Sequence, residues 1–395
     1  MTAMEKKDKN LNVPNLRFPE FSGEWEKCAL GGIGTTFNGL TGKSANDFGS
    51  GSPFITYKSI FDSSKIDISK IEYVRISETE RAKQTQNEVE YGDIFFTTSS
   101  ETPEEVGMAS VLLTPIHDCY LNSFCFGYRL FDKQAYLPDF FRFYLRSNNV
   151  RRKIAILAQG STRFNISKNE VMKMSIFLPS QNEQRKISEF FSLIEERIET
   201  QRKIIEKYES LIRGLYQFLF QQAKYDHFVS LGDISQISNG NSDVKDASMY
   251  NDGSLYPFFD RSDEIKFLPE YLFDKEAIIY PGEGAEFYPR YYNGKFALHQ
   301  RCYAVYDIST DFIPRYLYHY CKTQNSYFVR NAVGSTVASL RLDTFKRLKI
   351  PAIPTHHQEA LVMFLDKIEA KIECNRTILK KYEEQKKYLL FTLFI

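Results

Sequence analysis

The sequence has few cysteines, and none of them stand close together as a C-x-x-C pair. The six cysteines among 395 residues form no C-x-x-C motif and no metal-ligand spacing, which argues against a disulfide framework or a zinc site and predicts reduced thiols. No stretch approaches the roughly 18 consecutive apolar residues of a membrane span. The charged start, MTAMEKKDKN, lacks the apolar core of a signal peptide. We therefore expect a soluble protein of the cytoplasm.

Motifs of known catalytic sites are also missing. The Gly-Lys-Ser at the end of Gly39–Ser44 would need a glycine five residues before its Gly-Lys pair to form a phosphate-binding loop, but Phe37 stands there. Gly282–Gly284 lacks the third glycine of a dinucleotide loop. Glu264 and Lys266 are spaced like a nuclease pair, but such pairs are common by chance in a chain with 26% charged residues. Neither an Asn/Asp-Pro-Pro-aromatic segment for adenine methylation nor a metal-ligand spacing among the six histidines is found, so we predict no catalytic and no metal site.

The composition instead describes an ordinary globular chain large enough for two hydrophobic cores. Hydrophobic residues make up 43% and aromatic residues 15% of the sequence. The net charge is only +1. Any surface for a polyanion must therefore be local.

A long segment of the sequence occurs twice. Residues 184–220 align without a gap with residues 358–394. Matching residues stand 174 positions apart (382 − 208 = 174), and they include Glu195 and Glu369, Arg202 and Arg376, Tyr208 and Tyr382, and Phe220 and Phe394. Such agreement at fixed positions indicates a duplication.

The duplication extends into the segments that precede these repeats. Gly160–Thr162 matches Gly334–Thr336 at the same offset of 174. Farther upstream, Leu-Gly-x-Ile followed by Asn-Gly begins at Leu30 and again at Leu231, an offset of 201 (231 − 30 = 201). The first globular half therefore holds 27 additional residues (201 − 174 = 27), so the interiors of the two halves have diverged.

Apolar residues in both repeats recur at alternating steps of four and three. This heptad pattern predicts two long coiled-coil helices, each spanning roughly 55 Å at about 1.5 Å per residue. One polar residue, Gln201 or Asn375, interrupts each seam at the same place. It either fixes the register of the helices or is simply tolerated near water. The seam residues are Ile194, Ile198, Gln201, Ile205, Tyr208, Ile368, Ile372, Asn375, Leu379 and Tyr382.

The two globular halves combine strand-like and helix-like patterns. Short aromatic or alternating runs bounded by turn residues predict strands near residues 93–97, 123–128, 277–280 and 302–306. Helix-like stretches follow near residues 139–152 and 311–327. We predict an α+β fold in each half, closed by its long helix.

Positive charge is concentrated at matching places of the two halves. Residues 141–186 contain ten basic and two acidic side chains, a net charge of +8, and residues 313–350 contain seven and one, a net charge of +6. Two local basic surfaces in a nearly neutral chain are typical of nucleic-acid binding. A solvated helical face balanced by nearby acids is the alternative interpretation.

Small polar and basic residues near these stretches could contact phosphates and base edges. They could also form ordinary turns and, around Tyr292, an ordinary aromatic hairpin. The predicted DNA-contacting residues are Arg151, Arg152, Lys153, Ser161, Thr162, Arg163, Asn165, Lys168, Arg290, Tyr292, Arg330, Ser335, Thr336 and Arg341.

Taken in order, these segments resemble the specificity (S) subunits of type I restriction-modification systems. The residues that carry the resemblance are Pro14–Trp25 as an N-terminal arm, the Leu-Gly-x-Ile…Asn-Gly start of each half, and Leu178–Gln184 before the first long helix. The second copy departs from the pattern, because His357 stands where Glu183 stands in the first. The resemblance covers essentially the whole chain.

The resemblance implies a fold and a division of labour. Each half would be a target-recognition domain for one half of a split, asymmetric DNA site, and the helices would pack as an antiparallel coiled coil with pseudo-two-fold symmetry. Two methyltransferase (M) and two restriction (R) subunits would dock on this chain, partly through the seam helices. S-adenosylmethionine, ATP and Mg²⁺ would bind to those partners, and no cofactor to this chain.

The expected domains follow from the repeats and the resemblance. They are an arm (1–20), a first target-recognition domain (21–180), a first spacer helix (181–222), a second target-recognition domain (223–355) and a second spacer helix (356–395). Two other functions stay open from the residues alone. One is a stand-alone nuclease or NTPase, and the other is a coiled-coil scaffold that does not bind DNA.

Overall fold

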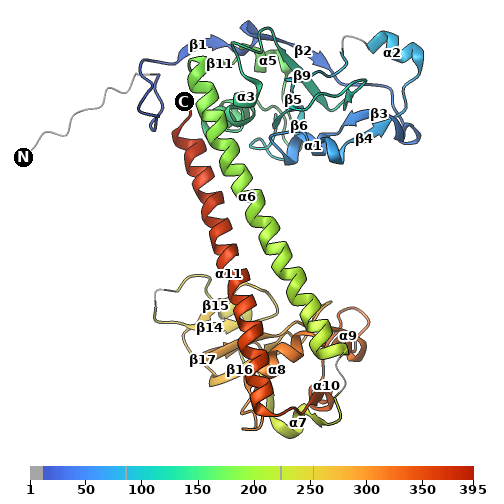
Figure 1. The fold of residues 1–395 in the computed structure, drawn as a ribbon, viewed down its shortest axis with the longest axis vertical. Coiled ribbons are helices and arrows are strands. Elements are labelled where there is room, and N and C mark those ends of the chain that lie inside the picture. The colour runs from blue at the N-terminus through green and yellow to red at the C-terminus, as the bar shows by residue number, and fades with distance from the viewer. Residues whose placement is uncertain (1–11, 85–86, 223–224, 252) are drawn as a thin grey trace, which may run out of the picture. The chain divides into compact units, whose positions relative to one another are not determined.

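The computed structural model describes residues 12–84, 87–222, 225–251 and 253–395, and it divides into two compact units (Figure 1). Unit 1 comprises the chain up to Thr200 together with Leu379–Ile395, and unit 2 comprises Gln201–Ile378. Each unit thus contains parts of both sequence repeats. Residues 1–11 of the predicted arm lie outside the described residues.

Unit 1 is built on a four-stranded sheet in the order β2-β9-β5-β7 and a three-stranded sheet in the order β4-β3-β8. Two further strand pairs, β1–β11 and β6–β10, complete it. Its strands are β1 (Glu26–Ala29), β2 (Gly34–Asn38), β3 (Phe48–Ile55), β4 (Glu72–Val74), β5 (Ile94–Thr97), β6 (Ser99–Ser100), β7 (Ala109–Val111), β8 (Tyr120–Leu121), β9 (Cys125–Leu130), β10 (Phe164–Asn165) and β11 (Ser175–Leu178). Its shorter α-helices are α1 (Tyr57–Asp62), α2 (Glu78–Gln84), α3 (Pro138–Tyr144), α4 (Asn148–Ile156) and α5 (Lys168–Lys173).

Unit 2 contains a six-stranded sheet in the order β13-β18-β16-β17-β14-β15 and the separate pair β12–β19. Its strands are β12 (Phe228–Ser230), β13 (Gln236–Asn239), β14 (Tyr256–Phe259), β15 (Lys266–Leu268), β16 (Phe273–Tyr280), β17 (Arg290–Leu298), β18 (Tyr303–Tyr306) and β19 (Lys349–Pro351). Its shorter α-helices are α7 (Leu231–Ile234), α8 (Pro314–Lys322), α9 (Asn325–Asn331) and α10 (Leu342–Arg347). The α+β prediction is confirmed for both halves.

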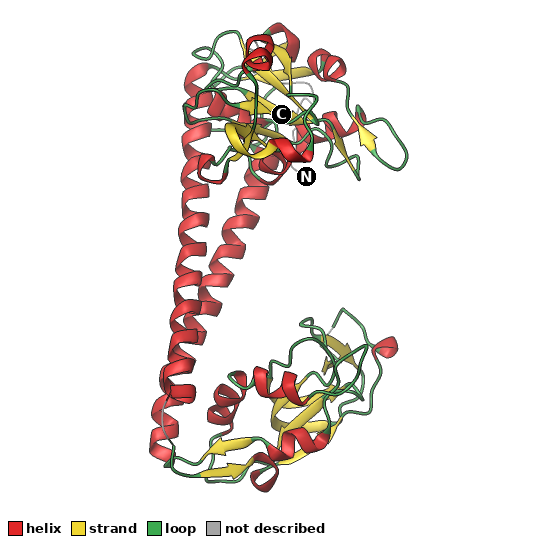
Figure 2. Ribbon diagram, turned by 90° about the vertical axis from the view of Figure 1, so that its right-hand side faces the viewer, coloured by secondary structure: helices red, strands yellow, loops and turns green. Residues whose placement is uncertain are grey.

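Two long helices carry the heptad repeats. Helix α6 runs over Gln181–Tyr216 and continues into a π-helical turn at Gln217–Gln222, and α11 runs over Thr355–Thr392. The helices lie side by side (Figure 2). In unit 1, Glu195 of α6 pairs with Lys386 of α11, with 2.6 Å between carboxylate and ammonium.

The contacts in unit 2 show the direction of the helices. Gln201 contacts Asn375 at 2.5 Å between side-chain atoms, and the Tyr216 hydroxyl donates to Glu369 at 2.9 Å. Residue numbers increase along α6 while those of the α11 partners decrease, so the two helices are antiparallel in this unit. This settles an orientation that the heptad spacing alone left open.

The predicted seam residues face the partner helix or the globular part of their own unit. Ile194, Ile198, Gln201, Ile205, Ile368 and Ile372 are buried, whereas Tyr208, Asn375, Leu379 and Tyr382 are half-buried. Exposed charged residues alternate with these seam residues in both helices. Each of α6 and α11 therefore has one apolar and one polar face.

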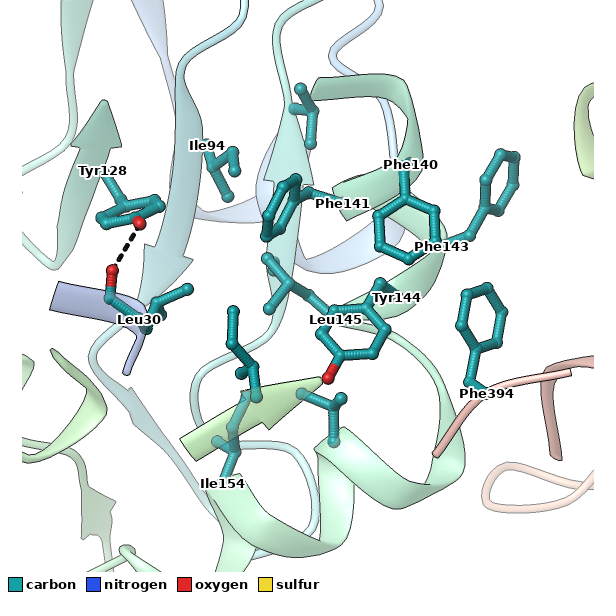
Figure 3. Packing of buried hydrophobic residues seen from close by; sticks show 14 of the residues in the cluster. Leu30, Ile94, Tyr128, Phe140, Phe141, Phe143, Tyr144, Leu145, Ile154 and Phe394 are labelled. Carbon is teal, nitrogen blue, oxygen red and sulfur yellow. Dashed lines mark hydrogen bonds between the residues drawn. The ribbon is translucent and has the colours of Figure 1, made fainter. Parts of the chain in front are cut away.

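The core of unit 1 lies between the four-stranded sheet, α3, α4 and the long helices. Phe140 and Tyr144 of α3 project toward Phe394, which follows α11, and Tyr128 of β9 donates its hydroxyl to the Leu30 carbonyl at 2.7 Å (Figure 3). Phe394 also stacks on Phe191 of α6 with ring centroids 5.6 Å apart. The segment that ends α11 is therefore part of the core of unit 1.

Each helix-like stretch of the sequence forms two helices. Residues 139–152 are divided between α3 and α4, and residues 311–327 between α8 and α9. Helices α3 and α8 both begin with proline at the first helical position, where the missing N–H costs no hydrogen bond. The prediction missed the breaks because the apolar pattern continues across them.

The duplication is visible in the strand registers. Asn38 lies opposite Phe126 in unit 1, and Asn239 lies opposite Tyr303 in unit 2. These pairs are related by offsets of 201 and 177 (239 − 38 and 303 − 126). The pairs Ala29–Ser175 and Ser230–Lys349, which join β1 to β11 and β12 to β19, are related by offsets of 201 and 174 (230 − 29 and 349 − 175). Both units therefore share one strand framework.

Most of the 27 additional residues of the first half lie in one segment. Through their strand partners, Ile55 corresponds to Phe259 (259 − 55 = 204), and Phe95 corresponds to Ile279 (279 − 95 = 184). Thus 20 of the 27 residues (204 − 184 = 20) lie between β3 and β5, where unit 1 has α1, β4 and α2.

The described part of the arm ties the start of α6 to the end of α11. Arg17 forms a two-pronged ion pair with Glu183 at 2.7 and 2.8 Å, and Trp25 packs beside it in the core. The Leu16 N–H donates to the Thr392 carbonyl at 3.0 Å. Among the helices of the described residues, none has the length and apolar character needed to cross a bilayer.

Candidate nucleic-acid interface

A small hairpin presents the first Gly-Ser-Thr segment to solvent. Gln159 and Asn165 exchange two backbone hydrogen bonds of 2.9 and 2.8 Å, and Gly160 has a φ of +133°. A side chain at Gly160 would meet the Arg163 carbonyl at 2.2 Å, so this tight turn requires glycine. Ser161, Thr162 and Arg163 are exposed at its tip.

The second Gly-Ser-Thr segment forms the corresponding hairpin. Val333 and Ser339 exchange bonds of 2.9 and 2.8 Å, and Gly334 has a φ of +118°. Ser335 and Thr336 are exposed. The repeated glycine therefore has a structural reason, and the hydroxyls beside it are available to a ligand in both units.

Each hairpin is fixed to a residue that follows a central strand. The Ile166 N–H donates to the Thr98 carbonyl at 2.9 Å, just after β5, and the Leu340 N–H donates to the Gly282 carbonyl at 2.8 Å, after β16. Thr98 and Gly282 have the same offset as Phe95 and Ile279 (282 − 98 = 184). Both hairpins thus occupy one position of the shared framework.

A cleft opens beside each hairpin. The first cleft has a volume of 350 Å³ and the second a volume of 510 Å³. Thr98, Ser123 and Cys125 line the first, and the corresponding Gly282, Gln300 and Cys302 line the second. Burial raises the pKa of Cys125 to about 12 and that of Cys302 to about 11, so both thiols stay protonated at neutral pH.

The repeated Asn-Gly dipeptide allows two backbone segments to meet at each cleft. A side chain at Gly39 would lie 2.0 Å from the Asn122 carbonyl, and one at Gly240 would lie 1.9 Å from the Leu298 carbonyl. Only glycine permits this approach. The motif that marks the start of each half therefore shapes the cleft of each unit.

Amides, hydroxyls and one lysine line the first cleft. Lys168 donates to the Asn38 side-chain oxygen at 2.8 Å, and Asn87 donates to Gln84 at 2.7 Å. Ser123 is exposed at the rim. Of the predicted DNA-contacting residues, Lys168 lies in this cleft, beside the hairpin that carries Ser161–Asn165.

Charged side chains dominate the second cleft. Lys266 forms a close ion pair with Asp260, which is 4% exposed, and Arg301 contacts both carboxylate oxygens of Glu283 at 3.0 and 2.9 Å. Arg301 is 64% exposed. Glu264 and Lys266 are spaced like a nuclease pair in the sequence, but Lys266 contacts the carboxylate of Asp260 instead.

Two predicted DNA-contacting arginines serve inside the chain instead. Arg151 donates to the carbonyls of residues 104, 106 and 107, and burial lowers its pKa to about 10. Arg290 donates to the carbonyls of Asp260 and Ser262 and is likewise shielded from water. Their donors hold loops in place, so both side chains have a structural role, and their predicted contact with DNA stays a prediction.

Other predicted contacts lie away from the clefts. Lys153 lies over the ring of Phe177 at 4.9 Å, and burial lowers its pKa. Arg152 is exposed and lies 5.9 Å from the ring of Phe391. Tyr292 is half-buried and packs on Phe259 and Phe296, as the hairpin alternative supposed.

The remaining three predicted residues lie on the surface of unit 2 or within the hairpin of unit 1. Arg330 is exposed and donates to the Ser326 carbonyl at 3.1 Å. Arg341 is exposed at the start of α10. In unit 1, the Asn165 side chain donates to the Arg163 carbonyl at 3.3 Å, so it stabilises the hairpin.

Sequence reasoning missed the residues that the strands bring to the clefts. Gln84, Asn87 and Ser123 in unit 1, and Gln300 and Arg301 in unit 2, lie outside the basic stretches. The turn before each buried cysteine was a possible signal, because Asn122–Cys125 and His299–Cys302 share one backbone hydrogen bond pattern.

The Gly-Lys-Ser segment has a structural role. Lys43 pairs with Glu80 at 2.7 Å, and Ser44 caps a short helix through Asp47. The ion pair lowers the pKa of Glu80 to about 2. This arrangement agrees with the missing first glycine of a phosphate-binding loop.

One buried polar group joins α8 to α11 in unit 2. His319 contacts Asp366 at 2.8 Å, and its ring lies 2.9 Å from the Tyr216 hydroxyl. His319, Asp366 and Glu369 could together offer three metal-ligand atoms within 4.8 Å. Because Arg315 pairs with Asp366 and Lys322 pairs with Glu369, both carboxylates are already neutralised, which fits a structural network better than a cation site.

Comparison with known proteins gives one family. The sequence model described as "Type I restriction modification DNA specificity domain" matches residues 22–209 and again residues 225–384. No curated protein matches the chain.

Two solved structures share the fold. One, described as the S subunit of a type I restriction-modification system from M. genitalium, has a TM-score of 0.64 at 15% identity and covers 97% of this chain and 99% of its own. The other, from a study of complex assembly and conformational transition of the type I R-M system, has a TM-score of 0.57 at 14% identity and covers 93% and 96%. With both halves matched by the family model, the chain belongs to the family of type I restriction-modification DNA specificity proteins.

Proposed function

We propose that this chain reads a bipartite, asymmetric DNA sequence for a type I restriction-modification complex. The observation that carries the proposal is one strand framework present twice, with a hairpin and a cleft at the same position and different side chains around each cleft. A duplicated framework with diverged surfaces suits two unlike half-sites. The family match supports the DNA specificity.

The long helices would set the distance between the half-sites. Helices α6 and α11 have 36 and 38 residues, which corresponds to roughly 55 Å at about 1.5 Å per residue. One turn of DNA measures about 34–36 Å. A helix pair of this length is thus of the right order to separate two readers along the duplex.

Methylation and cleavage would be the work of partner subunits. By resemblance, two M subunits would bring S-adenosylmethionine, and two R subunits would bring ATP and Mg²⁺. One of the structural neighbours was solved in work on the assembly of a type I complex, which supports a search for such partners. The structural role of Lys43 in an ion pair argues against an ATP site at Gly-Lys-Ser.

Mapping methylated adenines genome-wide tests the proposal. Cells that contain the M subunits with this chain should methylate a two-part sequence, and cells without the chain should not. A chimera that takes residues 21–180 from a relative should change one half-site and leave the other and the spacer intact. Methylation that does not depend on this chain, or a chimera that changes both half-sites, would refute the proposal.

A further inference from the structure

We infer that the two clefts are the base-reading sites of the chain, with amide groups around Asn87 in the first and Arg301 with Gln300 in the second contacting base edges. The inference rests on the proposed function and assigns its specificity to particular side chains. The inference gives no such role to eight of the residues predicted from the sequence, because they are half-buried, structural or remote from the clefts.

The position of the clefts is the first argument. Each lies beside a hairpin whose exposed hydroxyls, at Ser161 and Thr162 or Ser335 and Thr336, can bind phosphates. Each is fixed to that hairpin by one backbone bond, at Thr98 or Gly282. A DNA backbone held by the hairpin would therefore bring base edges to the adjacent cleft.

The difference between the linings is the second argument. The backbone of the clefts is the same, since the glycine contacts at Gly39 and Gly240 recur. The side chains differ at corresponding positions, as in Ser123 and Gln300. Groups that bind the DNA backbone should be the same in the two recognition domains, whereas groups that contact bases should differ.

The chemistry of the linings is the third argument. Asparagine and glutamine pair with adenine through two hydrogen bonds, and arginine pairs with guanine. Glu283 accepts hydrogen bonds from only one terminal nitrogen of Arg301, so this carboxylate can orient the guanidinium and leave the other nitrogens to donate to a base edge. We therefore expect at least one adenine in the half-site of unit 1 and at least one guanine in that of unit 2.

The clefts can be tested with matched pairs of variants. In unit 2, Arg301→Ala removes a cleft arginine paired with an acid, and Arg347→Ala removes an exposed arginine that pairs with Asp343 outside the cleft. In unit 1, Lys168→Ala removes the cleft lysine, and Lys173→Ala removes an exposed lysine on the same helix. Asn87→Ala tests the amide of the first cleft directly.

Selection of bound duplexes from a random pool, with the chain assembled with its M subunits, gives the readout. Arg301→Ala should lose the preference for guanine at one position of one half-site, by tenfold or more. Asn87→Ala or Lys168→Ala should relax only the other half-site. Both control variants should select the same DNA sequence as the wild-type complex, even if they bind every DNA sequence more weakly.

The outcomes separate the two proposals. A wild-type complex that selects no sequence refutes the proposed function. A sequence-selective wild type whose half-sites survive all three cleft substitutions refutes the base-reading clefts alone. A variant that unfolds at the wild-type midpoint temperature is shown to be folded. Arg301→Lys keeps the positive charge but not the bidentate geometry of the guanidinium, so it should also lose the guanine preference.

Discussion

At the scale of single residues, the feature that recurs most closely in the two copies is a buried amide. Gln184 accepts a bond from the Leu137 N–H and donates to the carbonyls of Ala135 and Pro179. Gln358 makes the same three contacts with Ile313, Asp311 and Ile353. Each amide joins the first turn of a long helix to the loop before α3 or α8.

Replacing one of these amides should destabilise its own unit. Gln358→Ala would leave three backbone groups without these partners, at a cost of about 1–3 kcal/mol for each group that water does not reach. We expect unit 2 to lose about 3 kcal/mol of unfolding free energy in denaturant titrations. Glu359→Ala, an exposed neighbour, serves as the control, and a loss for Gln358→Ala below about 1 kcal/mol would show that the amide is not needed.

The buried His319 predicts a pH dependence. Burial, the largest cause, lowers the pKa of His319 below its usual value, although Glu369 and Asp366 oppose this effect. The unfolded state therefore binds the proton more readily, so stability is complete above about pH 6.5 and decreases as the pH falls below it.

The melting temperature of unit 2 should thus be lower at about pH 5.5 than at about pH 7.5. In this interval Asp366 and Glu369 stay ionised, because the net effect of their cationic partners lowers both pKa values despite burial. His319→Gln should weaken the unit but remove most of this pH dependence, whereas the exposed His356→Gln should retain it. An unchanged slope in His319→Gln would assign the effect to other groups.

At the scale of elements, the sequence predicted the repeating parts better than the parts that differ. Heptads indicated the two long helices because burial of an apolar seam has a clear period, as at Ile194 and Ile368. The strand framework followed from short apolar runs. The breaks after α3 and α8 were missed, since residues such as Leu145 are buried although they lie outside a helix.

The candidate site was less predictable for a physical reason. Basic side chains are visible in a sequence, but their partners are not, so Arg151 and Arg290 looked free while they bind carbonyl groups. Arg301 and Asn87 reach their clefts only because the fold brings together segments that are distant in the chain. The two Gly-Ser-Thr segments could be placed in turns from the sequence, because a glycine turn is a local feature.

The polar layer of the helix pair offers a test of the spacer. Gln201 donates to both the side-chain oxygen and the carbonyl of Asn375, at 2.5 and 3.1 Å. Adding one heptad to each helix on the same side of this layer would retain the seam and lengthen it by about 10 Å at about 1.5 Å per residue. This corresponds to roughly three base pairs at about 3.4 Å each.

We therefore expect the unread spacer of the methylated sequence to grow by about three base pairs, with both half-sites unchanged. Methylome sequencing measures this directly. A control with the two heptads substituted in place, at constant length, should keep the original spacer. If the spacer does not respond to the added heptads, the helices do not set the distance.

At the scale of the whole molecule, the compact units differ from the sequence repeats. Unit 1 takes Leu379–Ile395 from the end of the second repeat, and Phe394 of that segment is 1% exposed against Phe140, Tyr144 and Phe191. The stability of the first globular half therefore depends on residues that are far away in the sequence.

Phe394→Ala should weaken unit 1 and leave unit 2 nearly intact. Truncation of a buried phenylalanine typically costs about 3–5 kcal/mol. Hydrogen exchange should show faster opening of α3 and β9 but unchanged protection of β16 and β18. The neighbouring Phe391→Ala, at a position 40% exposed, is the control, and equal loosening of both units would contradict the division.

Unit 1 is made of two segments that are far apart in the sequence, and this determines the order in which the two units can fold during synthesis. Gln201–Ile378 is continuous, so unit 2 has its whole sequence as soon as Ile378 has left the ribosome. Unit 1 begins first but still lacks the segment with Leu389, Leu393 and Phe394 at that moment. The half that is translated first is thus the last that can be completed. Until then, the apolar face of its part of α6 lacks the α11 residues against which it packs.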